Sequence, residues 1–266
     1  MSAALVVVRP HGPTPSALAD WRALAVRHLV QILRRPATLI GVLCTPMVFA
    51  VLFFAVFGRF IPASGLGYAQ YLLPAVLIQA TLSNGISAAV AAAEDVGTGF
   101  LRRLRALPIA RSAPLLGWLA ARVLVALVSL LLLVSVGYGL GFRFLGGPPA
   151  TVGFVLCTIL LALTVCSGYL ALGLSIQKLP LLDAVCNLVY FPMLLLSNAF
   201  TPTGSYPGWL RPVIAQLPVS RIADLLRALS VPATPPVSTV LIGLAWLLGP
   251  LVLFVWLGAR RFGRQA

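Results

Sequence analysis

Residues 36–58 read PATLIGVLCTPMVFAVLFFAVFG, a run of 23 residues without a charged side chain. The hydrocarbon core of a bilayer is about 30 Å thick, and an α-helix needs roughly 20 residues to cross it. The only hydroxyl groups in the run belong to Thr38 and Thr45, which a helix can bond to its own backbone. The run therefore predicts a transmembrane helix at about 37–58.

Five more stretches of this kind follow along the chain. They lie at about 68–92, 115–142, 151–176, 184–200 and 237–259. Over all 266 residues, 60% are hydrophobic and 9% are charged, whereas soluble domains have about a quarter of their residues charged. The sequence predicts an all-α, polytopic membrane protein whose six transmembrane helices form a single domain over residues 1–266.

The distribution of positive charge orients the six spans. The chain has 19 Lys and Arg against 5 Asp and Glu, a formal net charge of +14. An even number of spans places both termini on one side, and 13 of the 19 cations fall in the segments on that side. Cytoplasmic loops carry the excess of Lys and Arg, so both termini are expected in the cytoplasm. Arg122, inside the third span, is expected to snorkel to its inner end.

The same charge has a second interpretation, which is binding to nucleic acid. No soluble domain is present to carry such an interface, and the cations lie beside long apolar runs. Orientation in an anionic bilayer explains them better, so no nucleic-acid partner is expected. The preference for Arg over Lys and for Ala is typical of a GC-rich bacterial genome, which places the chain in the bacterial inner membrane.

Residues 20–35, before the first span, have the pattern of an amphipathic helix. One arc of the helical wheel is apolar and holds Trp21, Ala25, Val26, Leu29, Val30, Ile32 and Leu33. The other arc holds Asp20, Arg27, Gln31, Arg34 and Arg35, while Arg22 and Leu24 fall on the arcs opposite to their kind. We expect an interfacial helix with its cationic face toward lipid head groups. A solvated, positively charged tail is the alternative.

Residues 94–111 read EDVGTGFLRRLRALPIAR and are too polar to cross a membrane. Phe100, Leu101, Leu104 and Leu107 recur at helical spacing, which predicts a short cytosolic helix with one apolar face. Thr98 is suited to cap its start and Pro108 to end it. An apolar face on a cytosolic helix favours a partner groove. A positive loop that packs on lipid explains the pattern equally well.

Residues 201–236, before the last span, contain many Pro and Gly residues and two short amphipathic patterns. Each pattern is too short to cross the bilayer, so the segment is expected to form a re-entrant helical hairpin in the outer leaflet. Backbone at that depth must be shielded by protein or face a watery cavity, so the hairpin is expected to roof the bundle. Asp224 is placed to pair with Arg221 or Arg227.

Several motifs in this order resemble the type-2 family of ATP-binding-cassette exporter permeases, in the branch of daunorubicin-resistance-type drug and lipid exporters. The resemblance covers essentially the whole chain. It is carried by Arg34-Arg35-Pro36 with Pro46, by Glu94, Gly97-Thr98, Leu101 or Leu104, Pro108-Ile109 and Arg111, by Gly141 to Phe144, and by Ser197 to Pro202 with Tyr206 to Leu210.

The resemblance implies a permease dimer, of identical or sister chains, on two cytosolic ATPase subunits that bind ATP and Mg. Export of a lipophilic drug-like or lipid substrate would follow from ATP hydrolysed there. The 94–111 segment would be the coupling helix in a groove of the ATPase. The coupling residues that it implies are Glu94, Gly97, Thr98, Phe100, Leu101, Arg102, Arg103, Leu104, Pro108 and Arg111.

Two further sets of residues are candidates within the membrane. Polar side chains at depth are few, and those expected along a substrate pathway are Gln79, Ser83, Asn84 and Asn187. Each is more often an interhelical hydrogen bond than a substrate contact. The residues expected at an outer gate are Phe200, Pro202, Trp209 and Arg227.

The sequence also bears on other functions. A phosphate loop requires Gly-Lys-[Ser/Thr], but the single lysine, Lys178, is followed by Leu179, so no ATPase activity and no bound cofactor are expected in this chain. None of the four cysteines forms a C-x-x-C pair or has a histidine nearby, so no metal site is expected. Both histidines lie before the first span, which leaves no base at membrane depth for hydrolysis. An ion-coupled carrier, which usually has carboxylates at mid-membrane, and a non-transporting scaffold subunit stay as alternatives.

Overall fold

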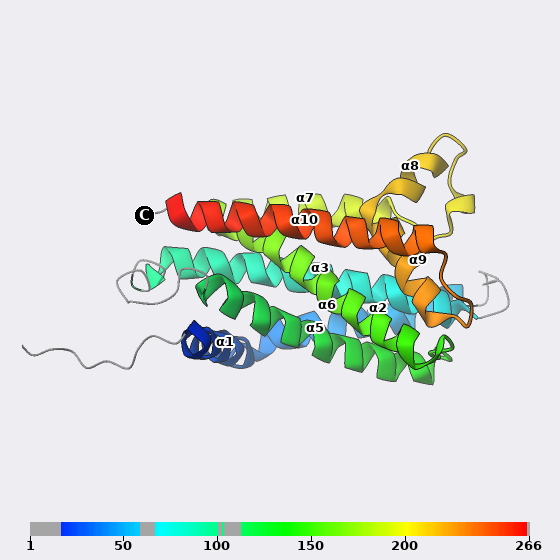
Figure 1. Ribbon diagram of the computed structural model, residues 1–266, viewed down its shortest axis with the longest axis horizontal. Helices are drawn as coiled ribbons and strands as arrows, with labels where there is room; N and C mark the ends of the chain where they lie inside the picture. Colours follow the sequence, from blue (N-terminus) through cyan, green and yellow to red (C-terminus); the bar gives the residue numbers. More distant parts are fainter. Residues whose placement is uncertain (1–16, 59–66, 101–102, 104–112, 265–266) are drawn as a thin grey trace, which may run out of the picture.

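The computed structural model describes residues 17–58, 67–100, 103 and 113–264, and every regular element in these residues is helical. Figure 1 shows the long helices side by side along the long axis of the molecule. Helix α1 (Ala17–Leu33) lies at the end of the bundle where α10 (Val237–Arg264) finishes. The short helices α8 (Arg211–Gln216) and α9 (Pro218–Ser230) lie at the opposite end.

Five helices are long and apolar enough to cross a membrane. They are α2 (Pro36–Phe57), α3 (Tyr68–Gly97), α5 (Ala113–Gly139), α6 (Gly147–Ser175) and α10. The predicted span at 184–200 corresponds to α7 (Leu179–Leu195), an apolar helix of 17 residues. At 1.5 Å per residue, α7 is about 26 Å long, somewhat short for a 30 Å hydrocarbon core. The all-α membrane class is confirmed, and the count of six spans stays a prediction.

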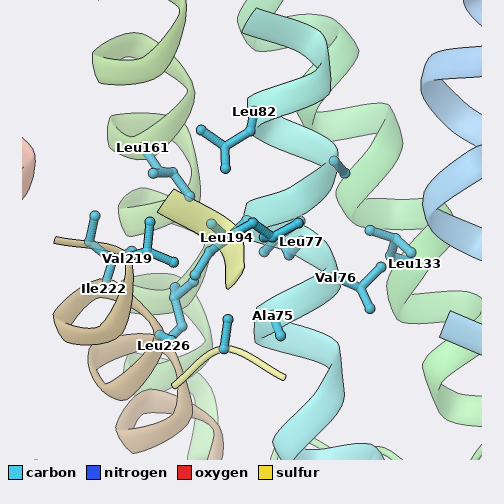
Figure 2. Packing of buried hydrophobic residues seen from close by; sticks show 14 of the residues in the cluster. Ala75, Val76, Leu77, Leu82, Leu133, Leu161, Leu194, Val219, Ile222 and Leu226 are labelled. Carbon is cyan, nitrogen blue, oxygen red and sulfur yellow. The ribbon is translucent and has the colours of Figure 1, made fainter. Parts of the chain in front are cut away.

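Helix α3 is the centre of the bundle. Of its most apolar 18 residues, 72% are buried, against 17% for α2 and 11% for α10. It packs against α2, α5, α6, α7 and α9. Figure 2 shows Leu77 and Leu82 of α3 in one apolar cluster with Leu161 of α6, Leu194 of α7 and Ile222 of α9. The outer helices expose apolar surface, as expected of helices that face lipid.

Helices α3 and α6 approach closely because small residues line their contact. Ala88 and Ala89 of α3 are fully buried, and Gly173 of α6 lies against them. A Cβ atom at Gly173 would overlap the backbone carbonyl of Ala89. Interfaces between membrane helices commonly use small residues in this way, because van der Waals packing improves as the backbones approach.

Replacement of Gly173 by valine is expected to separate α3 from α6 and to lower the yield of folded protein. Overpacking of a close contact typically costs about 1–3 kcal/mol or more, and here the overlapping atom is backbone, which cannot rotate away. Gly204, whose Cβ position meets no atom within 4 Å, is the matched control. Thermal unfolding of both purified variants tests this, and equal melting temperatures would contradict it.

Candidate functional site

The carboxylate of Asp95 joins three helices at the end of α3. Its Oδ1 accepts a hydrogen bond from Nη2 of Arg27 in α1 at 3.1 Å. Its Oδ2 accepts one from the indole Nε1 of Trp118 in α5 at 3.2 Å. The Asp95 side chain is 8% exposed, so this ion pair is only weakly screened by salt.

Two aromatic rings complete this cluster. The guanidinium of Arg27 lies over the ring of Phe100, 3.3 Å from its centroid. The His28 ring is 5.4 Å from the Trp118 ring, and its Nδ1 is 3.9 Å from Oδ2 of Asp95. Burial lowers the pKa of His28 to about 4 and outweighs the opposite effect of Asp95, so the imidazole is neutral at pH 7. We call Arg27, His28, Asp95, Phe100 and Trp118 the inner joint.

The inner joint corrects the expected orientation of α1. Leu24, expected on the polar arc, is buried against Gly117 of α5, where a Cβ would be within 3 Å of the Leu24 Cβ. Val26 and Val30, expected on the apolar arc, do not pack into the bundle and are exposed. Arg27, expected among lipid head groups, turns inward to Asp95. The apolar residues of α1 lie on two sides of the helix: one side packs against the bundle, and the other is exposed. A helical wheel drawn from the sequence does not separate these two sides.

The coupling segment begins inside α3 rather than after it. Glu94 and Asp95 lie in the last turn of that helix, and Glu94 pairs with Arg35, at the junction of α1 and α2, with Oε2 and Nη1 2.7 Å apart. Thr98, expected to start the next helix, instead ends α3, and its hydroxyl donates to the Asp95 carbonyl at 3.3 Å.

The remaining coupling residues divide into two groups. Gly97 ends α3 and is exposed, and the Nη2 of Arg103 donates to the Thr98 carbonyl at 2.9 Å. The other residues of the predicted set lie outside the described part of the chain: Leu101, Arg102, Leu104, Pro108 and Arg111. The structure therefore brings Glu94, Thr98, Phe100 and Arg103 together at one end of the bundle.

Arg122 of α5 does not snorkel as expected. It is 8% exposed, its Nη1 donates to Oδ1 of Asn84 at 3.3 Å, and its Nη2 donates to the Ser87 carbonyl at 3.0 Å. The Asn84 amide in turn donates to the Arg122 carbonyl at 3.0 Å. Asn84 and Ser87 of α3 lie within hydrogen-bonding distance of the Arg122 guanidinium. The side chain is therefore buried among protein groups and does not extend to the membrane surface.

The four predicted pathway residues do not gather around one cavity. Asn84 is engaged by Arg122, and the amide of Asn187 donates to the Asp183 carbonyl one turn earlier at 2.9 Å. Gln79 is buried, and its Oε1 has no hydrogen-bond partner among the described residues. Ser83 is half-buried on the same helix. Within the described residues, no group of three or more His, Cys, Asp or Glu side chains is arranged to bind a metal.

Arg227 of α9 holds the short helices against the opposite end of α3. Its guanidinium donates to the carbonyls of Asn198 at 3.0 Å and Ala199 at 2.7 Å, and it lies over the Tyr71 ring, 3.6 Å from the centroid. Oδ1 of Asp224 lies 3.4 Å from Nη1 of Arg227, and this ion pair is one of the two that the sequence predicted. The hydroxyl of Tyr71 donates to the Asn198 carbonyl. We call Tyr71, Asn198, Ala199, Asp224 and Arg227 the outer clamp.

The other predicted gate residues lie around this clamp in different settings. Phe200 packs on Phe53 of α2, with ring centroids 4.9 Å apart. Pro202 is half-buried before the short 3-10 helix η1 (Thr203–Ser205). Trp209 is 76% exposed and takes no part in the clamp. An exposed indole near a membrane surface is typical of an interfacial anchor.

An apolar cavity of about 560 Å³ lies between α6, α7, α9 and α10, with α3 behind it. Few polar groups reach it, among them Thr164 and Tyr169. Binding sites for small molecules typically have volumes of about 300–1,000 Å³ and mostly apolar walls. Its lining includes Ile78, Leu82, Leu172, Met193, Ile222 and Phe254.

Sequence reasoning missed the partners that make both clusters. Trp118 and His28 were unassigned, as were Tyr71 and Asn198, because each meets its partner across a long sequence separation. One signal was present: Asp95 is one of only five acids in a strongly basic chain, so a buried partner for it was to be expected.

Comparisons with known proteins agree on one family. The profile of the ABC-2 type transporter family matches residues 19–230. A daunorubicin resistance ABC transporter permease protein, DrrB1 of Streptomyces coeruleorubidus, is 31% identical over 79% of this chain and 72% of its own. The doxorubicin resistance ABC transporter permease protein DrrB of Mycobacterium tuberculosis is 30% identical over 85% of this chain and 83% of its own. A putative transport permease, ycf38 of Porphyra purpurea, is 25% identical over 79% of this chain and 73% of its own.

Proposed function

The chain belongs to the ABC-2 type transporter family, and from this we propose that it is the permease subunit of an exporter driven by a separate ATPase. The relatives named as daunorubicin and doxorubicin resistance permeases support a lipophilic, drug-like or lipid substrate. The partners in this proposal are a cytosolic ATPase subunit, which binds ATP and Mg, and a second permease chain.

The inner joint is the observation that best supports this function. A coupling segment can drive a permease only if it is attached firmly to the helices that must move. Asp95 is the second residue of that segment and bonds to both α1 and α5. Because α3 is the most buried of the long helices, a displacement applied after Gly97 would reach the centre of the bundle.

The apolar cavity is the best candidate for the substrate pathway among the described residues. Its walls offer burial to a lipophilic molecule but almost no polar anchor. Such a site selects by size and apolar surface rather than by hydrogen bonding, since a hydrophobic pocket discriminates weakly between similar molecules. The outer clamp holds α9, which lines this cavity through Val219 and Ile222.

The orientation that we propose places both termini and the inner joint on the cytoplasmic side of a bacterial inner membrane. The excess of cations in the segments on that side supports it. The outer clamp then faces away from the cytoplasm. In this orientation the ATPase would contact the 94–111 segment.

The ion-coupled carrier is the main alternative, and the placement of the acids argues against it. Asp95 and Glu94 lie in the last turns of α3, Asp183 in the second turn of α7, and Asp224 in α9. None of these described acids lies in the middle of a long helix, where a proton or ion relay would require one. A scaffold subunit would not require the attachment of the coupling segment to α3.

Charge reversal of the coupling segment tests the proposal. We expect Leu104→Asp, and separately the combined change of Arg102, Arg103 and Arg105 to Glu, to release or uncouple the ATPase without loss of membrane insertion. The measurement is co-purification of the ATPase together with its substrate-stimulated activity. Arg211→Glu, a reversal at the far end of the bundle, is the matched control. Normal amounts of a coupled ATPase on the altered segment would contradict the assignment.

A further inference from the structure

A second cavity, of about 170 Å³, lies beside the inner joint between α1, α2, α3 and α5. This volume is more than a single water molecule needs. One wall is apolar, formed by side chains such as Ile32, Leu39 and Val42. The other carries His28, Ser87 and Arg122. The family assignment does not account for such a mixed cavity at the end of a membrane bundle.

The carboxylates of Glu94 and Asp95 line this cavity together with Arg35 and Arg122, but both carboxylates are paired with arginines other than Arg122. Arg27 pairs with Asp95, and Arg35 pairs with Glu94. Arg122 has no carboxylate within 4.0 Å in the described residues, and its acceptors there are the neutral side chain of Asn84 and the Ser87 carbonyl. Arg122 is 8% exposed, and its guanidinium is permanently charged. Among the described residues, the buried positive charge of Arg122 therefore has no carboxylate paired with it.

An uncompensated buried charge is costly, and membrane proteins usually pair such groups. The outer clamp illustrates the usual solution, because Arg227 has the Asp224 carboxylate beside it. Arg122 has instead a cavity beside it. The missing partner is therefore expected to be a bound anion rather than a side chain.

The donors around the cavity indicate which anion. Arg122 has five N–H groups, only two of which donate to described acceptors. The neutral His28 ring donates its Nδ1 proton to Oε1 of Gln31 at 3.0 Å, so its buried Nε2 is an acceptor and adds no donor for an anion. The Ser87 and Thr38 hydroxyls also line the space. An anion with several oxygen acceptors suits this set, and arginine binds phosphate particularly well through its planar fork.

The mouth of the cavity indicates where the anion comes from. Arg35 and Thr38 are exposed at the junction of α1 and α2, while the apolar wall continues along α2. In the proposed orientation this junction lies at the inner surface of the bilayer, where phospholipid phosphates lie above their acyl chains. A lipid can therefore present its phosphate to Arg122 and its chain to Leu39 and Val42.

We propose that this cavity binds the phosphate group of an inner-leaflet anionic phospholipid, with Arg122 as its counter-charge and the Ser87 hydroxyl as a further donor. The bound lipid fills the space between α1, α2 and the end of α3, next to the inner joint. The inference depends on the proposed orientation but not on transport. The test measures lipid binding, so a negative result would count against this site without counting against the exporter assignment.

The test uses the full-length chain, purified in a neutral detergent and freed of lipid, with its melting temperature followed during titration. Dioleoyl-phosphatidylglycerol is the lipid probe, dioleoylglycerol has the same chains without phosphate, and inorganic phosphate has no chains. We expect saturable stabilisation by phosphatidylglycerol and none by dioleoylglycerol. Arg122→Gln is expected to weaken apparent binding at least tenfold, and Arg34→Gln, an exposed arginine at the same end, less than twofold.

A second variant and a second measurement cover the case that Arg122→Gln does not fold. Ser87→Ala changes no charge and is expected to weaken phosphatidylglycerol binding severalfold, while native mass spectrometry of the unaltered chain should retain one phosphatidylglycerol per chain. Stabilisation by inorganic phosphate that Arg122→Gln abolishes would support a phosphate site filled from solution. Equal stabilisation by dioleoylglycerol, or phosphatidylglycerol binding that both variants leave unchanged, would overturn the proposal.

Discussion

Exchange of Asp95 for leucine is expected to abolish export and to lower the free energy of unfolding by about 2–4 kcal/mol. The change leaves the Arg27 guanidinium and the Trp118 N–H without their acceptor at a side-chain position that is 8% exposed. Loss of one partner of a fully buried ion pair costs about 3–5 kcal/mol, and the estimate here is lower because Arg27 is 30% exposed and can turn toward water. Denaturant unfolding and a whole-cell efflux assay measure the two effects.

Glu94→Leu is the matched control, because it removes the neighbouring carboxylate. The Arg35–Glu94 pair is 53% and 33% exposed, and pairs of this kind are worth about 0–1 kcal/mol. We expect this variant to keep most of its stability. If both variants lost equal stability, burial of Asp95 would not be the reason, and the inner joint would lose its special role.

Exchange of Arg227 for methionine is expected to release α9 from the end of α3. Several acceptors then lose their donor at once, including the Ala199 carbonyl and the Asp224 carboxylate. Each buried acceptor left unpaired costs about 1–3 kcal/mol, so a total loss of about 3 kcal/mol is expected. Hydrogen exchange should rise throughout 218–230, and lipophilic efflux should fall because α9 lines the apolar cavity.

The control for this change is Arg211→Met. Arg211 is exposed and donates to the carbonyls of Gly204 and Tyr206 within its own loop. Exposed substitutions of this kind usually shift stability by less than about 0.5 kcal/mol. Unchanged hydrogen exchange over 218–230 in the Arg227 variant would show that α9 is held by its apolar face alone.

Sequence patterns located the helices because long apolar runs have few alternatives in a membrane. The stretch at 36–58 is the clearest case, and α2 ends one residue before it does. The end of α3 was placed too early, at 92, because Glu94 and Asp95 are charged. Their partners, Arg35 and Arg27, neutralise them, so the helix continues to Gly97.

The candidate sites were predicted less completely than the helices. The pattern at 94–111 indicated an attachment point, but it held no sign of Trp118 or His28, which lie in other helices. Arg122 was expected at the membrane surface because the sequence gives no sign of its partner, Asn84, which lies 38 residues away. Contacts of this kind depend on how helices pack, and the period of a single helix does not encode them.

The most direct test of ATPase-driven export is transport by purified chains in sealed vesicles. We expect a lipophilic fluorescent reporter to accumulate in inside-out vesicles only when the partner ATPase, ATP and Mg are all present, and an imposed proton or sodium gradient to have no effect. Accumulation driven by an ion gradient in vesicles that contain this chain alone, without nucleotide, would contradict it.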